Sequence, residues 1–172
     1  MKRITCLALF ATMLAIYSCK PEKCCVIPEP PAKVTAQKDG APWSPMFAKG
    51  ILSATDSLSI SATGATYRSY PYQKTDTLNI SILYNKPGTY QLQGNQAFYG
   101  VFNDNILTGY QLDASYNNVI VITGYKRLTD PYSSVPDQVK ITGTFSLKFI
   151  DPNNPAGISF QNGSFYALVQ YQ

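Results

Sequence analysis

Hydrophobic and polar side chains alternate with a period of two along much of the chain after residue 33. The clearest case is the segment 139–149, in which Val, Ile, Gly, Phe and Leu take the odd positions and Lys, Thr and Ser the even ones. The segments 58–62 and 78–82 alternate in the same way, and so does 165–171. Successive side chains of a strand point to opposite faces, so each segment predicts a strand with one buried and one solvated face.

Two further runs, 98–102 and 119–122, are apolar at nearly every position and predict central strands that are covered on both faces. Turn dipeptides separate the runs: Asp39-Gly40, Pro87-Gly88, Gly94-Asn95, Asn117-Asn118 and Asn162-Gly163. This spacing predicts an all-β domain, an antiparallel β-sandwich of about nine or ten strands, with a lipocalin-like β-barrel as the alternative. Periodicity alone does not choose between the two.

The first residues carry the pattern of an export signal. Lys2 and Arg3 precede a mostly apolar run over residues 4–16, which is shorter than the roughly 20 residues that a membrane-spanning helix needs but fits the core of a secretory signal. The sequence Ile16-Tyr17-Ser18-Cys19 then resembles a bacterial lipobox. That resemblance implies cleavage before Cys19 and acylation of this cysteine. The alternative is a secreted protein that is cut near Ser18.

These observations divide the chain into three parts. We predict a lipoprotein signal peptide over residues 1–18, a lipid-anchored, proline-rich tether over 19–32 and the all-β domain over 33–172. Two buried acyl chains hold a protein durably on a membrane, so the expected location is the cell envelope, at the outer membrane. The sequence does not say which face of that membrane the domain occupies.

Composition excludes several kinds of chemistry. The 172 residues include no His, which removes Ser-His-Asp and Cys-His catalysis and His-ligated zinc. The cysteines Cys6, Cys19, Cys24 and Cys25 all precede the domain, so its fold uses neither a disulfide nor a thiolate. We interpret the last two as incidental thiols of the tether, with a vicinal disulfide or an intermolecular cross-link as the alternative.

The domain also lacks Glu, and its Asp residues stand mainly beside turns, where Asp usually bonds to the local backbone. No nucleotide-binding or nucleophile motif occurs. We therefore predict no catalytic residues, no cofactor and no metal. The oxygen-rich segments 103–105 and 151–154 lack EF-hand spacing and are interpreted as turns. Because no basic cluster exceeds Lys126-Arg127, nucleic acid is not an expected partner.

Tyrosines supply the candidate binding surface. Tyr67, Arg68, Tyr70 and Tyr72 fall in a proline-containing loop between two predicted strands, and Tyr132 lies in the long connection 126–136. Aromatic rings on a rigid loop give a large contact area at low entropic cost, so they suit a glycan or a protein partner. The alternative is that these rings only cover the edges of the sheet.

Three short motifs carry a resemblance over most of the chain. They are Lys38-Asp39-Gly40-Ala41-Pro42-Trp43, Ile141-Thr142-Gly143-Thr144-Phe145 and Asn162-Gly163-Ser164-Phe165. In this order and spacing they resemble an uncharacterised family of lipobox-bearing envelope lipoproteins from Bacteroidota. The resemblance implies a location and an all-β domain, and no activity. We expect Trp43 to fill the core, Gly143 to allow a close strand contact and Gly163 to form a tight turn.

Two further motifs, Asp56-Ser57-Leu58 and Asp76-Thr77-Leu78, resemble the site at which Bacteroidota attach O-glycans to exported proteins. Ser57 and Thr77 are therefore candidate O-glycosylation sites, with ordinary strand beginnings as the alternative. Together the sequence predicts a non-catalytic, lipid-anchored envelope protein that acts as a binding or accessory module. A barrel-type carrier of a small apolar ligand and a structural envelope component are the alternatives.

Overall fold

Eleven antiparallel strands form one sheet in the computed structural model, which describes residues 30–67, 73–103, 106–128, 138–151 and 154–170. The strands are β1 (Ala32–Lys38), β2 (Ala41–Trp43), β3 (Phe47–Leu52), β4 (Ser57–Tyr67), β5 (Gln73–Leu83), β6 (Gly88–Gln91), β7 (Ala97–Asn103), β8 (Ile106–Leu112), β9 (Val119–Leu128), β10 (Gln138–Asp151) and β11 (Asn154–Gln170), with a short 3₁₀ helix, η1 (Gly94–Gln96), before β7. The predicted all-β antiparallel class is confirmed. Within the described ranges, no helix has the length and apolar character needed to cross a membrane.

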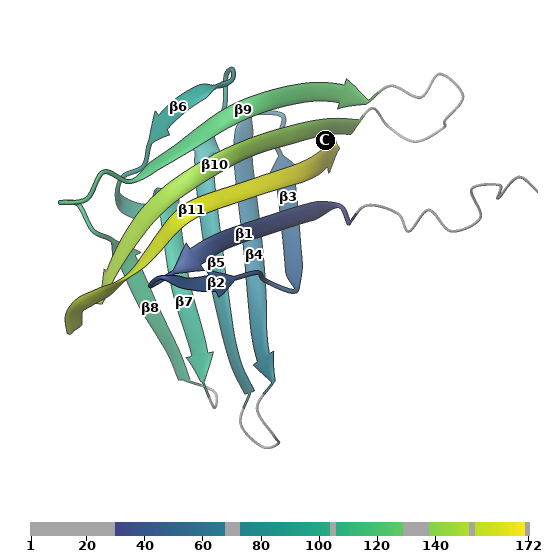
Figure 1. The fold of residues 1–172 in the computed structure, drawn as a ribbon. Helices are drawn as coiled ribbons and strands as arrows, with labels where there is room; N and C mark the ends of the chain where they lie inside the picture. Colours follow the sequence, from purple (N-terminus) through teal and green to yellow (C-terminus); the bar gives the residue numbers. More distant parts are fainter. Residues whose placement is uncertain (1–29, 68–72, 104–105, 129–137, 152–153, 171–172) are drawn as a thin grey trace, which may run out of the picture.

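The sheet curls over itself into two layers. Its strand order is β2-β1-β11-β10-β8-β7-β5-β4-β3, and β9 joins the same edge of β10 as β8, with β6 beyond it. Residues 138–146 of β10 pair with β9, whereas residues 149–150 pair with β8. Figure 1 shows β9, β10, β11 and β1 crossing steeply in front of β3, β4, β5, β7 and β8. The result is a half-barrel, intermediate between the sandwich and the barrel that the sequence left open.

The core lies between these front and rear layers. Along β10 the odd positions from Val139 to Phe149 are buried, as the alternation predicts, and the buried positions of β4 and β5 face them. Trp43 is buried against Phe160 with ring centroids 5.1 Å apart, which confirms that it fills the core. On one side the layers meet closely: a Cβ at Gly50 of β3 would collide with the side chain of Ala167 on β11.

The prediction that the run 98–102 is covered on both faces is wrong. Tyr99 points into the core and is fully buried, but Phe98 and Phe102 lie on the outer face of β7 and are 37% and 44% exposed. The rear layer has an inner face against the front layer, and its outer face meets solvent at these positions. The prediction for the run 119–122 is wrong in the same way, because Ile120 and Ile122 are buried whereas Val119 and Val121 are only partly buried. An apolar run therefore identifies a strand here but does not show that both faces of the strand are covered.

Two of the predicted turns have different outcomes. Asp39-Gly40 forms the two-residue loop between β1 and β2, with φ of 50° and 79°, as a type I′ hairpin turn requires. Asn162-Gly163 is not a turn but lies inside β11. There the pairing with β10 shifts between Phe145↔Gly163 and Leu147↔Phe160, and Asn162 adopts a φ of 50°. The prediction of a tight turn at Gly163 is therefore wrong, because these residues form a β-bulge.

The two motifs around Gly143 and Gly163 lie side by side in the sheet. Gly143 of β10 pairs with Phe165 of β11, and Phe145 pairs with Gly163, so each Phe stands opposite a Gly. A Cβ at Gly163 would lie 2.5 Å from the Phe145 ring, and one at Gly143 would lie 2.7 Å from the Phe165 ring and collide with the carbonyl oxygen of Val121. The close contact predicted at Gly143 is confirmed. Each ring covers the backbone that the opposite glycine leaves bare.

Candidate functional site

A polar cluster is buried on the inner face of the sheet. Asp76 of β5 is 8% exposed, and its Oδ2 atom accepts hydrogen bonds from Lys38 Nζ at 2.6 Å, Tyr99 OH at 2.9 Å and Trp43 Nε1 at 3.1 Å. Lys38 and Trp43 stand on either side of the Asp39-Gly40 turn. The first of the three sequence motifs is thus explained by this cluster, since its turn brings both donors to one carboxylate.

The cluster is satisfied internally. Burial raises the pKa of the Tyr99 phenol above its usual range, and the charge of Asp76 and the hydrogen bond to it raise this pKa further. The phenol therefore stays protonated, and its O–H group donates a hydrogen bond to Asp76. Lys38 Nζ also lies 3.0 Å from the Tyr99 oxygen. Because these donors form hydrogen bonds with the Asp76 carboxylate, we assign the cluster a structural role. It connects the β1–β2 hairpin to β5 and β7.

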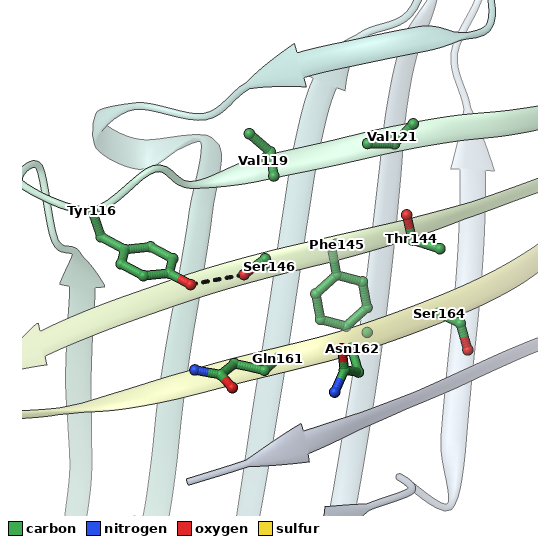
Figure 2. Close-up of a pocket in the computed structure, with 10 residues that line it drawn as sticks. Tyr116, Val119, Val121, Thr144, Phe145, Ser146, Gln161, Asn162 and Ser164 are labelled. Carbon is green, nitrogen blue, oxygen red and sulfur yellow. Dashed lines mark hydrogen bonds between the residues drawn. The ribbon is translucent and has the colours of Figure 1, made fainter. Parts of the chain in front are cut away.

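A groove of about 610 Å³ lies on the outer face of the front layer, over β9, β10 and β11. We call it the Tyr116 groove. Figure 2 shows its lining, which comprises Tyr116, Val119, Val121, Thr144, Phe145, Ser146, Gln161, Asn162, Gly163 and Ser164. None of these side chains carries a charge. Hydroxyl and amide groups dominate its polar surface, and two valines on β9 provide an apolar strip.

Strand periodicity and the bulge in β11 build this groove. Thr144 and Ser146 occupy even positions of β10, which point away from the core. The bulge turns two consecutive amides, Gln161 and Asn162, toward solvent, where a regular strand would bury one of them. Asn162 Nδ2 donates to Gln37 Oε1 at 3.1 Å, which fixes its side chain toward β1.

The loop between β8 and β9 positions Tyr116 at one end of the groove. The Tyr116 hydroxyl lies 2.9 Å from Ser146 Oγ (Figure 2). Asp113 anchors the loop, accepting from the Ser115 hydroxyl at 2.6 Å and pairing with Lys148 Nζ at 3.0 Å. The Ser115 hydroxyl, then Lys148, then the Ser115 backbone N–H lower the pKa of Asp113 to about 2. Asn118 completes the attachment, since its Oδ1 accepts from the backbone N–H of Lys148 at 2.8 Å.

Most of the site residues predicted from sequence lie outside the described residues. These are Cys19, Arg68, Tyr70, Tyr72 and Tyr132, whereas Tyr67 is the last residue of β4 and its side chain is not described. The binding loop and the lipidated cysteine therefore stay predictions. Ser57 is the first residue of β4, and Thr77 lies inside β5, where its hydroxyl is 3.3 Å from that of Thr63. O-glycosylation at these two positions also stays a prediction.

Sequence reasoning missed the residues of the Tyr116 groove. The alternation along β10 predicts only a solvated face at its even positions, and the dipeptide Asn162-Gly163 predicts a turn. The available signal was the unusual density of neutral hydroxyl and amide side chains on adjacent outward positions. In the part of the chain that the structure describes, no group of three or more His, Cys, Asp or Glu side chains is placed to hold a metal ion.

Fold and groove together define a curled all-β domain with an uncharged groove on its outer face. The family model of DUF6252, a domain of unknown function, matches residues 31–169. The chain therefore belongs to this family, and the expectation of an uncharacterised family is confirmed. Neither a curated protein nor a solved structure matches the chain.

Proposed function

We propose that this protein is a non-catalytic, lipid-anchored binding module of the cell envelope, and that the Tyr116 groove takes a neutral glycan. The observation that carries the proposal is the groove itself. It has about 610 Å³ of volume, its lining includes hydroxyls, amides, two valines and the partly exposed ring of Tyr116, and it contains no charged group. Its size falls within the roughly 300–1,000 Å³ range of small-molecule sites.

The lining matches the chemistry of a sugar chain. Hydroxyl and carboxamide groups both donate and accept hydrogen bonds, as sugar hydroxyls do. The apolar strip of Val119 and Val121 suits the C–H face of a sugar ring, and Tyr116 adds an aromatic wall at one end. An ionic ligand would lose its hydration in this groove without gaining a countercharge, so a neutral ligand is favoured.

Two observations favour surface binding over the other readings. The Asp76 carboxylate is used within the inner cluster, so it is not free for acid–base chemistry. In the interior, Tyr99, Phe149 and Phe160 pack with ring centroids 5.1–5.9 Å apart, so rings occupy space that a carrier would leave for its ligand. A purely structural component would not need the groove, so it would give no signal shifts in the test below.

The test is an NMR titration of the full chain in a detergent without a sugar headgroup. The probes are neutral β-linked glucan and α-linked mannan oligosaccharides. We expect the amide signals of residues 119–121, 144–146 and 161–164 to shift saturably with at least one of them. Thr144→Arg, which fills the groove from an exposed strand position, should abolish these shifts, whereas Thr55→Arg on the exposed β3–β4 turn should retain them.

If none of the probes shifts these signals, the glycan proposal is wrong. If Thr144→Arg and Thr55→Arg behave alike, binding occurs elsewhere and the assignment to the groove is wrong. Thermal melting of both variants checks that the chain remains folded. We expect little change, because a substitution at an exposed position typically changes stability by less than about 0.5 kcal/mol.

The anchor is tested separately by metabolic labelling with an alkyne fatty acid in a bacterial host that processes lipoproteins. We expect the label on the wild-type chain and on the Cys24→Ser and Cys25→Ser variants, and its loss in Cys19→Ser. Labelling that survives Cys19→Ser would overturn the anchor, and unlabelled wild-type protein would support a simple secreted protein.

A further inference from the structure

On the outer face of the rear layer, an aromatic ring lies on the backbone of two paired glycines. Gly100 of β7 and Gly109 of β8 are directly paired across the two strands. A Cβ at Gly100 would lie 2.9 Å from Phe98 Cε1, and one at Gly109 would lie 3.0 Å from Phe98 Cε2. The Phe98 ring therefore lies across both glycines. One side of the ring rests on backbone, and with 37% of the residue exposed the other side meets solvent.

Beside this ring lies a trough of about 230 Å³, which we call the Phe98 trough. Its lining comprises Lys49, Ile51, Ser59, Ile60, Ser61, Asn79, Ile80, Ser81, Asn95, Gln96 and Phe98. The floor consists of short polar side chains on β4 and β5, including Ser59 and Ser81, whose hydroxyls are 2.7 Å apart. Phe98 stands on one side and Ile51 on the other, and Lys49 is the one charged residue of the lining.

We infer that the Phe98 trough is a second binding site, which holds one pyranose ring of a sugar chain. It lies on the rear layer, so it faces away from the front layer that carries the Tyr116 groove (Figure 1). The inference does not depend on the Tyr116 groove, because it rests on different strands and on different side chains.

Three features select this ligand. The exposed side of the Phe98 ring is a planar apolar surface, which the C–H face of a pyranose covers with little loss of hydration. The serine hydroxyls and the amides of Asn79, Asn95 and Gln96 offer hydrogen-bond donors and acceptors to sugar hydroxyls. The volume is below the roughly 300–1,000 Å³ typical of drug-sized ligands, so the trough suits one ring of a chain.

Phe102 provides the matched comparison within the same strand. It lies on the same outer face of β7 as Phe98 and is 44% exposed, but it does not line the trough. Exposure of a phenylalanine on this face therefore does not by itself define the site. What distinguishes Phe98 is the pair of glycines beneath its ring and the polar floor beside it.

The test uses the same NMR titration of the full chain with neutral glucan and mannan oligosaccharides, read at the amides of residues 59–61, 79–81 and 95–98. We expect saturable shifts there. Phe98→Ala should weaken binding at these amides by about tenfold, the scale of one lost aromatic contact. Phe98→Tyr should retain it, since the ring remains. Phe102→Ala should leave the affinity unchanged.

A second variant keeps the test independent of the loss of the ring. Gly109→Ala places a methyl group 3.0 Å from Phe98 Cε2 and displaces the ring by a few tenths of an ångström, so it should weaken binding at these amides less than Phe98→Ala does. Equal affinities of wild type, Phe98→Ala and Gly109→Ala would overturn the inference, and so would an equal loss in Phe102→Ala. Thr144→Arg should leave these shifts intact. If the wild-type chain shows saturable shifts at residues 59–61, 79–81 and 95–98 but none at 119–121, 144–146 and 161–164, the proposed function is contradicted and this second site is not.

Discussion

The inner and outer faces of the sheet use the same pairing of a phenylalanine ring with glycine, with different consequences. On the inner face, Phe145 covers Gly163 and is 3% exposed. On the outer face, Phe98 covers Gly100 and Gly109 and is 37% exposed. In both places the missing Cβ lets a ring lie on the backbone. Inside, the second layer covers the other side of the ring; outside, that side meets solvent.

Two Lys–Asp pairs of the described chain, Lys38–Asp76 and Lys148–Asp113, show the same contrast. Lys38–Asp76 is 2.6 Å long, lies inside and shares its carboxylate with Trp43 and Tyr99. Lys148–Asp113 is 3.0 Å long and holds the loop that carries Tyr116 on the outer face. The inner pair joins strands far apart in the sequence, whereas the outer pair fixes a loop beside a binding groove. The inner pair therefore contributes to stability, and under the proposed function the outer pair positions Tyr116 for binding.

The largest expected effect separates the two rings. Phe145→Ala removes a buried ring and leaves a cavity that the front and rear layers cannot close, so it should lower the free energy of unfolding by about 3–5 kcal/mol. Phe98→Ala removes a ring that is already partly hydrated and should cost about 1 kcal/mol. Urea denaturation of both variants measures the difference. Similar losses would show that the outer ring is as important to folding as the inner one.

A smaller effect is expected when the glycine is changed and the ring is kept. Gly143→Ala introduces a methyl group against the carbonyl oxygen of Val121 and the Phe165 ring, and neither can move away inside the sheet. We expect a loss of about 2–3 kcal/mol, typical of overpacking. Gly109→Ala should cost less than about 1 kcal/mol, because the Phe98 ring can swing into solvent. Equal losses in thermal or urea unfolding would contradict the proposed difference between the faces.

Local patterns predicted the parts of the fold that local interactions determine. The alternation over 139–149 identified β10 with its buried face, and Asp39-Gly40 identified the β1–β2 turn. The same kind of signal failed at Asn162-Gly163, because a dipeptide that allows positive φ fits a bulge as well as a turn. The apolar run 98–102 identified a strand but not its neighbours, since periodicity does not report how many layers cover it.

The Asp76 cluster and the Tyr116 groove could not be predicted from the sequence for a different reason. Asp76 receives donors from Lys38, Trp43 and Tyr99, which are brought together only by the curled sheet and the β1–β2 hairpin. The Tyr116 groove combines three strands and a loop, and its residues are ordinary strand residues one by one. The second and third motifs contained a hint, because each holds Gly-x-Phe, but the reciprocal pairing of these triplets requires the register of β10 and β11.

The smallest effect concerns acid and the loop of the outer face. The pKa of Asp113 is about 2, below its ordinary value of 3.8, so between these values the unfolded chain binds more protons at this residue than the folded one. The contribution of Asp113 to stability should be fully present above about pH 4 and should decline as the pH falls toward 2. Asp113→Asn lacks this titration. The difference in unfolding free energy between wild type and Asp113→Asn should therefore be constant from neutral pH to about pH 5 and shrink below pH 4, because the other carboxylates titrate in both proteins. A difference that stays constant down to pH 2 would show that Ser115 and Lys148 do not stabilise the charge of Asp113, and that another contact holds Tyr116 over its groove.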